Sequence, residues 1–238
     1  MVVEILFQEV CGLYGDSQNA TYLQATLPDA EFIYTRLTDT PYFAAHKPDL
    51  IYIGCMSEST QRRVIAKLMP LKERLLELIE SGTPILATGN AGEIFTKQIE
   101  YVTEDITVEG LGIFDLTVKT DLFNRYNGMV LGEFQDIKIV GIRSQFSFLY
   151  GDNSSNYFLK CLRGDGIHPG NKLEGIRKNN LICTQLIGPI LPLNPLFCEY
   201  FIGLSGVKKP AAFRESAMEA YLQRLKEFSD PAISLKHS

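Results

Sequence analysis

Short apolar runs alternate with amphipathic segments through the first hundred residues. Residues 2–7, 31–34 and 49–53 are mostly apolar and have the length of strands, so we predict buried strands there. Residues 17–27 have helical spacing and follow Asp16, a residue type that often caps helices. The pattern therefore predicts strands and helices in alternation.

A longer helical pattern covers residues 58–80. Its apolar stripe consists of Val64, Ile65, Leu68, Leu75, Leu76 and Ile79. Pro70 predicts a bend or break within it, and residues 84–88 (PILAT) read as the next strand. Strands and helices joined by short connections predict an α/β fold, with a mainly parallel central sheet and helices on both faces. In such folds ligands bind beyond the carboxyl ends of the strands.

After residue 100 the pattern becomes β-rich. Residues 116–118, 129–134 and 137–142 predict short strands separated by glycines and polar turns, as in an antiparallel extension of the sheet. Residues 181–186 predict a further strand, and residues 196–204 predict a buried helix.

A final amphipathic segment, residues 212–228, predicts a helix with one packed side. That side carries Met218, Leu222 and Leu225. We expect the last ten residues to be frayed. The chain thus divides into one large domain, residues 1–205, and a C-terminal helix and tail, residues 206–238, packed on it.

Composition narrows the class of protein. With 238 residues, 45% of them hydrophobic, the chain can bury a full core without a metal or disulfide. Its 23 Lys and Arg are scattered and its formal charge is −5, which argues against nucleic-acid or anionic-membrane partners. Five cysteines without a CxxC pair and three widely separated histidines predict no disulfide frame and no metal site, and we expect no cofactor. With no apolar stretch of membrane-spanning length and no export segment, we expect a cytoplasmic protein.

The segment PILATGNAGE, residues 84–93, has the build of a nucleophile elbow. An apolar strand runs into a sharp turn of small residues, which we expect to open a helix. In enzymes that form acyl intermediates, such a turn presents a thiol or hydroxyl beside backbone N–H groups that stabilise an oxyanion. The tip residue here is Gly89, which has no side chain. Taken alone, such a segment is more often an ordinary tight turn of an α/β sheet.

Five segments in order carry a resemblance to a known family. They are GLYGDSQN (12–19), DLIYIGCMSESTQ (49–61), PILATGNAGE (84–93), VEGLGIFD (108–115) and IGPILPLNP (187–195). Together they resemble the class I glutamine amidotransferase domain, of the type found in cobyric acid synthase and in the amidotransferase subunit of lipid II isoglutaminyl synthase. The resemblance spans about residues 1–205 and implies a flavodoxin-like α/β fold.

The resemblance also implies a site that has lost its catalytic groups. The family hydrolyses glutamine and passes ammonia to a synthetase partner, using a thiolate, a histidine and backbone donors. The cysteine position falls on Gly89 and the histidine position on Ile187. Where the family usually has an acidic residue and a histidine, this chain has Arg143 and Gln145. Loss of the nucleophile or base lowers kcat by on the order of a millionfold, so the resemblance predicts no glutaminase activity.

Two function hypotheses follow. The first is a pseudoenzyme of cell-wall synthesis that serves as a binding or scaffolding subunit for a Mur-ligase-like or other synthetase partner. The second is an active amidohydrolase or amidotransferase whose chemistry has moved, to Cys55 in the glycine-rich turn or to a metal-free acid–base pair. Because the matched segments hold no histidine that would lower the pKa of Cys55, the first hypothesis needs fewer coincidences.

Four residues are candidates for holding a glutamine-like small molecule in the cleft. Asn90 either binds a ligand amide or only forms the turn. Arg125 either binds a ligand carboxylate or is a solvated loop arginine. Gln145 either hydrogen-bonds a ligand or caps a strand end, and Cys55 belongs to the turn beside the elbow.

Overall fold

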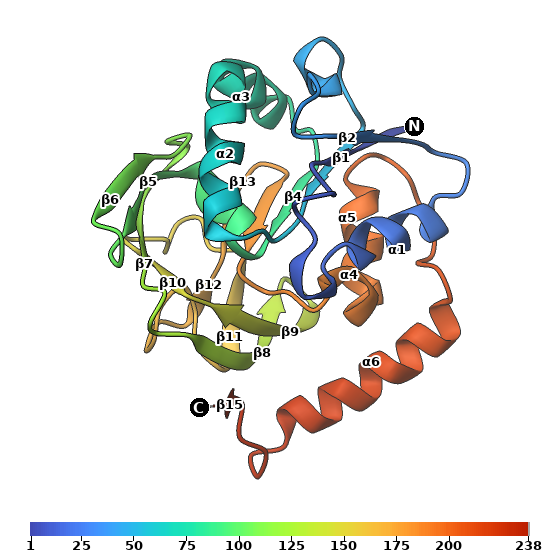
Figure 1. Cartoon of the computed structure of the whole chain (residues 1–238). Coiled ribbons are helices and arrows are strands. Elements are labelled where there is room, and N and C mark those ends of the chain that lie inside the picture. The colour runs from blue at the N-terminus through green and yellow to red at the C-terminus, as the bar shows by residue number, and fades with distance from the viewer. Residues whose placement is uncertain (238) are drawn as a thin grey trace.

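The central sheet has six strands and is parallel except at one edge (Figure 1). The structure is a computed structural model that describes residues 1–237, with side chains for residues 1–235. In spatial order the strands are β13 (Ile176–Lys178), β14 (Leu181–Thr184), β4 (Ile85–Thr88), β3 (Leu50–Ile53), β1 (Val2–Leu6) and β2 (Glu31–Thr35). Only β13 runs antiparallel to its neighbour.

Helices cover both faces of this sheet, as the sequence predicts. One face packs against α2 (Glu58–Leu68) and α3 (Lys72–Glu80), and the other against α1 (Gln18–Thr26), α4 (Ile190–Leu193) and α5 (Pro195–Gly203). Successive strand side chains point to opposite faces, so Ile51 and Ile53 join the first core and Leu50 and Tyr52 join the second. A 3-10 turn, η3 (Met69–Leu71), separates α2 from α3 at the predicted break.

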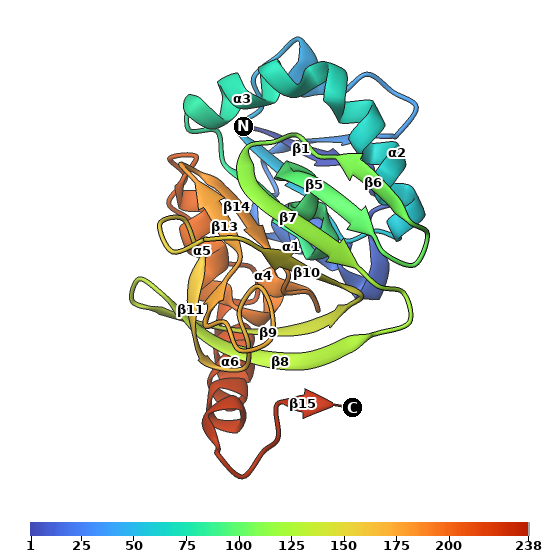
Figure 2. The same cartoon turned by 90° about the vertical axis from the view of Figure 1, so that its left-hand side faces the viewer.

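The β-rich part forms two further sheets beside the central one (Figure 2). The first contains β10 (Ser147–Tyr150), β7 (Phe114–Thr120), β5 (Thr96–Tyr101) and β6 (Ile106–Glu109) in that order. The second contains β12 (Leu173–Glu174), β11 (Leu159–Arg163), β8 (Tyr126–Phe134) and β15 (Lys236–His237), with β9 (Ile137–Gln145) paired to β8. Most pairs in these sheets are antiparallel; β5 and β7 run parallel.

The elbow segment does not open an α-helix, so that expectation is wrong. Residues Gly89–Phe95 form a 3-10 helix, η4, which leads directly into β5 at Thr96. The other short 3-10 helices are η1 (Leu13–Gly15) and η2 (Tyr42–Ala44). Because η4 is packed between α2, β4 and β14, the turn after β4 is held from several sides.

The C-terminal helix α6 (Arg214–Ser229) contacts β8 and β9, and it lies at the lower right of the molecule in Figure 1. Its buried anchor is Tyr221, whose hydroxyl donates to the carbonyl oxygen of Lys138 at 2.6 Å. The prediction that Leu222 packs is wrong, because its side chain points to solvent and the residue is 57% exposed. The expected fraying is wrong for Lys236 and His237, whose backbone pairs with β8.

Candidate functional site

A cavity lies at the carboxyl edge of the central sheet, where three loops meet. Because β4 pairs in parallel with both β3 and β14, the loops that follow these strands leave the sheet side by side. Cys55, Gly89 and Gln185 come from these three loops and line a cavity of about 240 Å³. The remaining walls come from η1, the start of α2 and residues 144–147. The cavity thus occupies the position where α/β sheets bind ligands.

Gly89 keeps the backbone of an elbow and has no room for a side chain. Its φ is +59°, a left-handed conformation that glycine adopts without steric cost. A Cβ atom added here would lie 2.7 Å from Cβ and 2.8 Å from Sγ of Cys55, and 3.1 Å from Cγ2 of Ile187. The space that a nucleophile would use is therefore occupied by these two side chains.

Cys55 is a poor replacement nucleophile in this setting. Its side chain is buried, and burial followed by the nearby charge of Asp16 raises the pKa of its thiol to about 12. The backbone N–H of Asn90 lies near the sulfur and offsets part of this rise in pKa. A thiol with this pKa is almost fully protonated at neutral pH, and only the thiolate form is reactive.

Ile187 lies where the resemblance puts the histidine, and it contacts the elbow tip. It is buried, and its backbone exchanges hydrogen bonds with Ile142 at 2.8 and 3.3 Å. None of the lining residues is a histidine. His46 stacks on Tyr42 and His168 stacks on Tyr150, so both rings are engaged outside the cavity.

Asp16 does not cap α1, so that prediction is wrong. Its carboxylate is fully buried and accepts hydrogen bonds from Thr88 Oγ1 at 2.5 Å, the Cys55 backbone N at 2.7 Å and Asn19 Nδ2 at 2.8 Å. Burial raises its pKa, and these hydrogen bonds oppose the rise. Asp16 therefore ties the loop after β3 to the end of β4 and fixes the position of Cys55 beside Gly89.

Three of the four predicted ligand residues line the cavity, and the fourth lies at its rim. Asn90 uses both ends of its amide on the backbone of Met56, at 2.9 and 2.8 Å. Gln145 accepts from Arg143 Nε at 2.9 Å and donates to the Ser147 carbonyl oxygen. Cys55 is the third lining residue. The exposed Arg125 donates to two lining residues, Ser144 Oγ at 3.1 Å and Tyr14 Oη at 2.8 Å.

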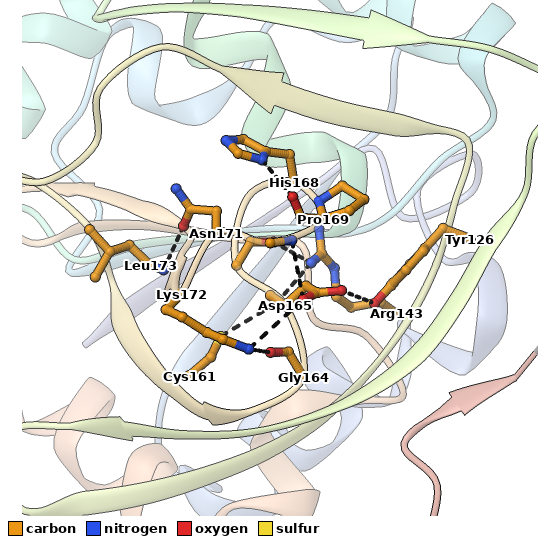
Figure 3. A network of polar contacts seen from close by, with 12 residues as sticks. Tyr126, Arg143, Cys161, Gly164, Asp165, His168, Pro169, Asn171, Lys172 and Leu173 are labelled. Atoms are coloured by element: carbon orange, nitrogen blue, oxygen red, sulfur yellow. Dashed lines mark hydrogen bonds and ion pairs between the residues drawn. The ribbon is translucent and has the colours of Figure 1, made fainter.

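Arg143 is fully buried next to the cavity residues Gln145 and Gln185, and Figure 3 shows it beside the loop that holds Asp165. Its guanidinium donates to the carbonyl oxygens of Asp165 and Gly166 and to Oε1 of Gln185. Burial lowers the pKa of Arg143, and the charge of Glu174 opposes that effect. Arg143, in the segment where the resemblance expects an acidic residue and a histidine, is thus a structural cation that holds the side chain of Gln185.

Glu93 is a cavity residue that the sequence analysis did not select. It is 2% exposed and accepts from Gln61 Nε2 at 2.9 Å and from Ser147 Oγ, while Tyr101 Oη donates to Gln61 Oε1 at 2.8 Å. Burial raises the pKa of Glu93 to about 7, although its hydrogen-bond donors lower it. The signal was present in the sequence: Glu93 is the only charged residue between Pro84 and Phe95.

The described residues contain no group of three or more His, Cys, Asp or Glu side chains suited to a metal ion. Within the same part of the chain, no helix has the length and apolar character needed to cross a membrane.

Comparison with known proteins supports the same α/β fold. No family model matches the chain. Over 232 residues it is 29% identical to the lipid II isoglutaminyl synthase (glutamine-hydrolyzing) subunit GatD of Staphylococcus aureus, covering 95% of this chain and 93% of that protein. A solved glutamine amidotransferase has a TM-score of 0.56 at 14% identity, with 87% of this chain and all of that chain (100%) covered. The chain therefore has a glutamine amidotransferase-like fold.

Two further structures from Thermotoga maritima share the fold of this amidotransferase-like domain. PurLQS has a TM-score of 0.52 at 12% identity and covers 94% of this chain and 98% of its own. A second glutamine amidotransferase has a TM-score of 0.50 at 11% identity, with 98% and 87% covered. The predicted fold class is therefore confirmed. In this fold, the two positions at which the resemblance places the nucleophile and the base lie next to each other, with Ile187 packed against Gly89.

Proposed function

We propose that this chain is a non-catalytic glutamine amidotransferase-like subunit that binds and supports a synthetase partner in the amidation of a cell-wall precursor. The observation that carries the proposal is the closed elbow: Cys55 and Ile187 occupy the space in which a side chain at residue 89 would stand. With glycine and isoleucine at these positions, the elbow has no side chain to form a thioester and no imidazole to move a proton, and the neighbouring Cys55 thiol is almost fully protonated.

The link to the cell wall rests on the staphylococcal relative, which is a subunit of a lipid II isoglutaminyl synthase and matches this chain over nearly its whole length. A subunit acts with a partner, and the partner that suits an amidating enzyme is a ligase that activates a carboxylate. We therefore propose a Mur-ligase-like or other synthetase partner. In this arrangement the partner takes free ammonia, and our chain contributes binding surface rather than hydrolysis.

An assay of glutamine hydrolysis tests whether the chain is non-catalytic. Ammonia release from glutamine is measured with this chain and, as a positive control, with the staphylococcal relative, and both are treated with a glutamine-mimicking electrophile. We expect no ammonia above the uncatalysed rate and no covalent label on this chain. Turnover, or a label on any of its cysteines, contradicts the proposal.

A partner assay tests the supporting role. The chain is co-expressed with a Mur-ligase-like protein from the same genome, the complex is purified, and amidation is followed with glutamine or with ammonium chloride as nitrogen source. We expect a stable complex that uses ammonium chloride only. Amidation supported by glutamine, or the lack of a complex with every ligase tested, argues against it.

A second function, hydrolysis through Cys55, is favoured by one specific observation. The backbone N–H of Asn90 is near enough to the Cys55 sulfur to lower the pKa of the thiol, and an elbow donor approaches a reacting atom in a similar way. Replacing Cys55 with serine separates the two functions. If any hydrolysis of small amides is detected and Cys55→Ser abolishes it, relocated chemistry replaces the non-catalytic role.

A further inference from the structure

The cavity wall carries negative charge, and the cation beside it, Arg125, is exposed at the rim, over the rings of Tyr14 and Phe146. Of its lining residues, Glu58 and Glu93 are acidic, and none is lysine, arginine or histidine. Glu93 lies at the deep end, where it is 2% exposed, while Glu58 lies in the first turn of α2 and is only partly buried. A ligand that brings a free carboxylate to the deep end would meet a like charge.

Glu93 has unused capacity to accept hydrogen bonds. A carboxylate offers about four lone-pair directions, and the observed donors are the amide of Gln61 and the hydroxyl of Ser147, both neutral. The closest buried cation, Arg143, reaches Gln185 and Gln145 instead, and its charge is balanced by Glu174. A buried carboxylate is costly unless it is paired, so this one is suited to a cation that arrives from the cavity.

Gln185 supplies a second, independent requirement. The residue is 6% exposed and lines the cavity, and its amide nitrogen makes no hydrogen bond of normal geometry with any residue that the structure describes. The same nitrogen is near enough to Glu93 to lower the pKa of that carboxyl. An unpaired buried donor loses its hydration without compensation, so the deep end also needs a hydrogen-bond acceptor close to the cation.

The size and lining of the cavity favour an organic cation over a metal ion. The volume of about 240 Å³ is far larger than a bare ion needs, and the part of the chain with described side chains has no cluster of three metal ligands. Apolar surface from Tyr14, Met56 and Phe146 is available for a carbon skeleton. The complement of this cavity is a small molecule with a cationic nitrogen, a nearby oxygen and a short carbon chain.

We propose that the cavity binds a small primary amine in its ammonium form, with Glu93 as counter-ion and with Gln185 donating to an oxygen acceptor two or three bonds from the nitrogen. This choice of ligand class for the cavity rests on the proposed function, in which no glutamine is hydrolysed there. The nitrogen donates to the free lone pairs of Glu93, and the ligand oxygen accepts from Gln185 Nε2. No bond is made or broken.

Three probes of similar size test both requirements. Ethanolamine carries the amine and the oxygen, n-propylamine carries only the amine, and propionate carries a negative charge. Binding to the full chain is measured by calorimetry and by the shift in Tm. We expect saturable binding of ethanolamine, about tenfold weaker binding of n-propylamine because the buried donor stays unpaired, and no binding of propionate. Propionate binding as tightly as ethanolamine, or no binding of either amine, overturns the inference.

Two variants locate the site. Glu93→Gln keeps the size of the side chain and removes the charge, and we expect at least a tenfold loss of ethanolamine affinity. Glu77→Gln, an exposed change on α3 outside the cavity, is the matched control and should bind as the parent does. Equal affinity in Glu93→Gln and Glu77→Gln overturns the inference; if Glu93→Gln does not fold, the three-probe comparison on the parent chain decides.

Ammonia release from glutamine is followed on the same protein samples. Absence of amine binding without ammonia release defeats the amine site and leaves the proposed function in place. Ammonia release defeats the proposed function and, with it, the basis of the amine site.

Discussion

Replacing Gly89 with alanine tests directly whether the elbow tip is closed. The added Cβ would approach the two side-chain atoms of Cys55 to 2.7 and 2.8 Å, closer than real Cβ contacts, and Ile187 Cγ2 to 3.1 Å. Overpacking of this kind costs about 1–3 kcal/mol. The left-handed backbone at φ +59° adds about 1–2 kcal/mol for a residue with a side chain. The free energy of unfolding should therefore fall by about 2–5 kcal/mol.

A matched glycine separates the two contributions. Gly206 has φ +85°, and nothing lies within 4 Å of a Cβ added there. Gly206→Ala should therefore show only the backbone cost, about 1–2 kcal/mol. Combining Gly89→Ala with Cys55→Gly removes the atoms that the new methyl would meet, so the double variant should be more stable than the sum of its single changes predicts, by about 1 kcal/mol or more.

Urea unfolding followed by circular dichroism gives the free energies, and equal m-values show that the unfolded states are comparable. A closed elbow tip is contradicted if Gly89→Ala loses no more stability than Gly206→Ala. It is also contradicted if Cys55→Gly does not reduce the cost of Gly89→Ala, because then Cys55 does not occupy the space over the elbow.

Three further results are expected. Burial raises the pKa of the Cys55 thiol to about 12, and the other four cysteines are also buried. A thiol reagent at pH 8 should therefore label the folded chain slowly and the urea-unfolded chain at all five cysteines. Rapid labelling of Cys55 in the folded chain would show an activated thiol. Burial raises the pKa of Glu93 from 4.5 to about 7, so the contribution of this side chain to stability is fully present below about pH 4.5 and is lost as the pH rises through 7. In urea unfolding, Glu93→Gln should therefore gain stability relative to the parent over that range. A difference that stays constant with pH would contradict the raised pKa of Glu93. Tyr221→Phe removes the hydrogen bond to Lys138 and should cost about 0.5–1.5 kcal/mol, whereas Leu222→Ala on the exposed side should cost less than about 0.5 kcal/mol; the reverse order in thermal unfolding would mean that α6 packs through another face.

The sequence predicted the parts of this protein that depend on local spacing. Apolar runs of strand length and helical stripes are recorded along the chain itself, so the parallel sheet, the helices on both faces and the break at Pro70 could be predicted. The prediction of an α-helix after the elbow was wrong because η4 is held between α2, β4 and β14, and this packing outweighs the weak conformational preference of a glycine-rich turn. The prediction that Leu222 is packed was wrong because the buried face of α6 is centred on Tyr221 instead.

The sequence by itself also determined that residue 89 is a glycine and residue 187 an isoleucine, at the positions where the resemblance expects a thiol and an imidazole. Only the tertiary structure decided what stands in their place. The contacts of Cys55 and Ile187 with Gly89, the burial of Glu93 and the unpaired amide nitrogen of Gln185 all depend on loops that follow different strands. Burial and charge at one residue depend on what packs against it from the rest of the chain, and no local pattern of residues records that.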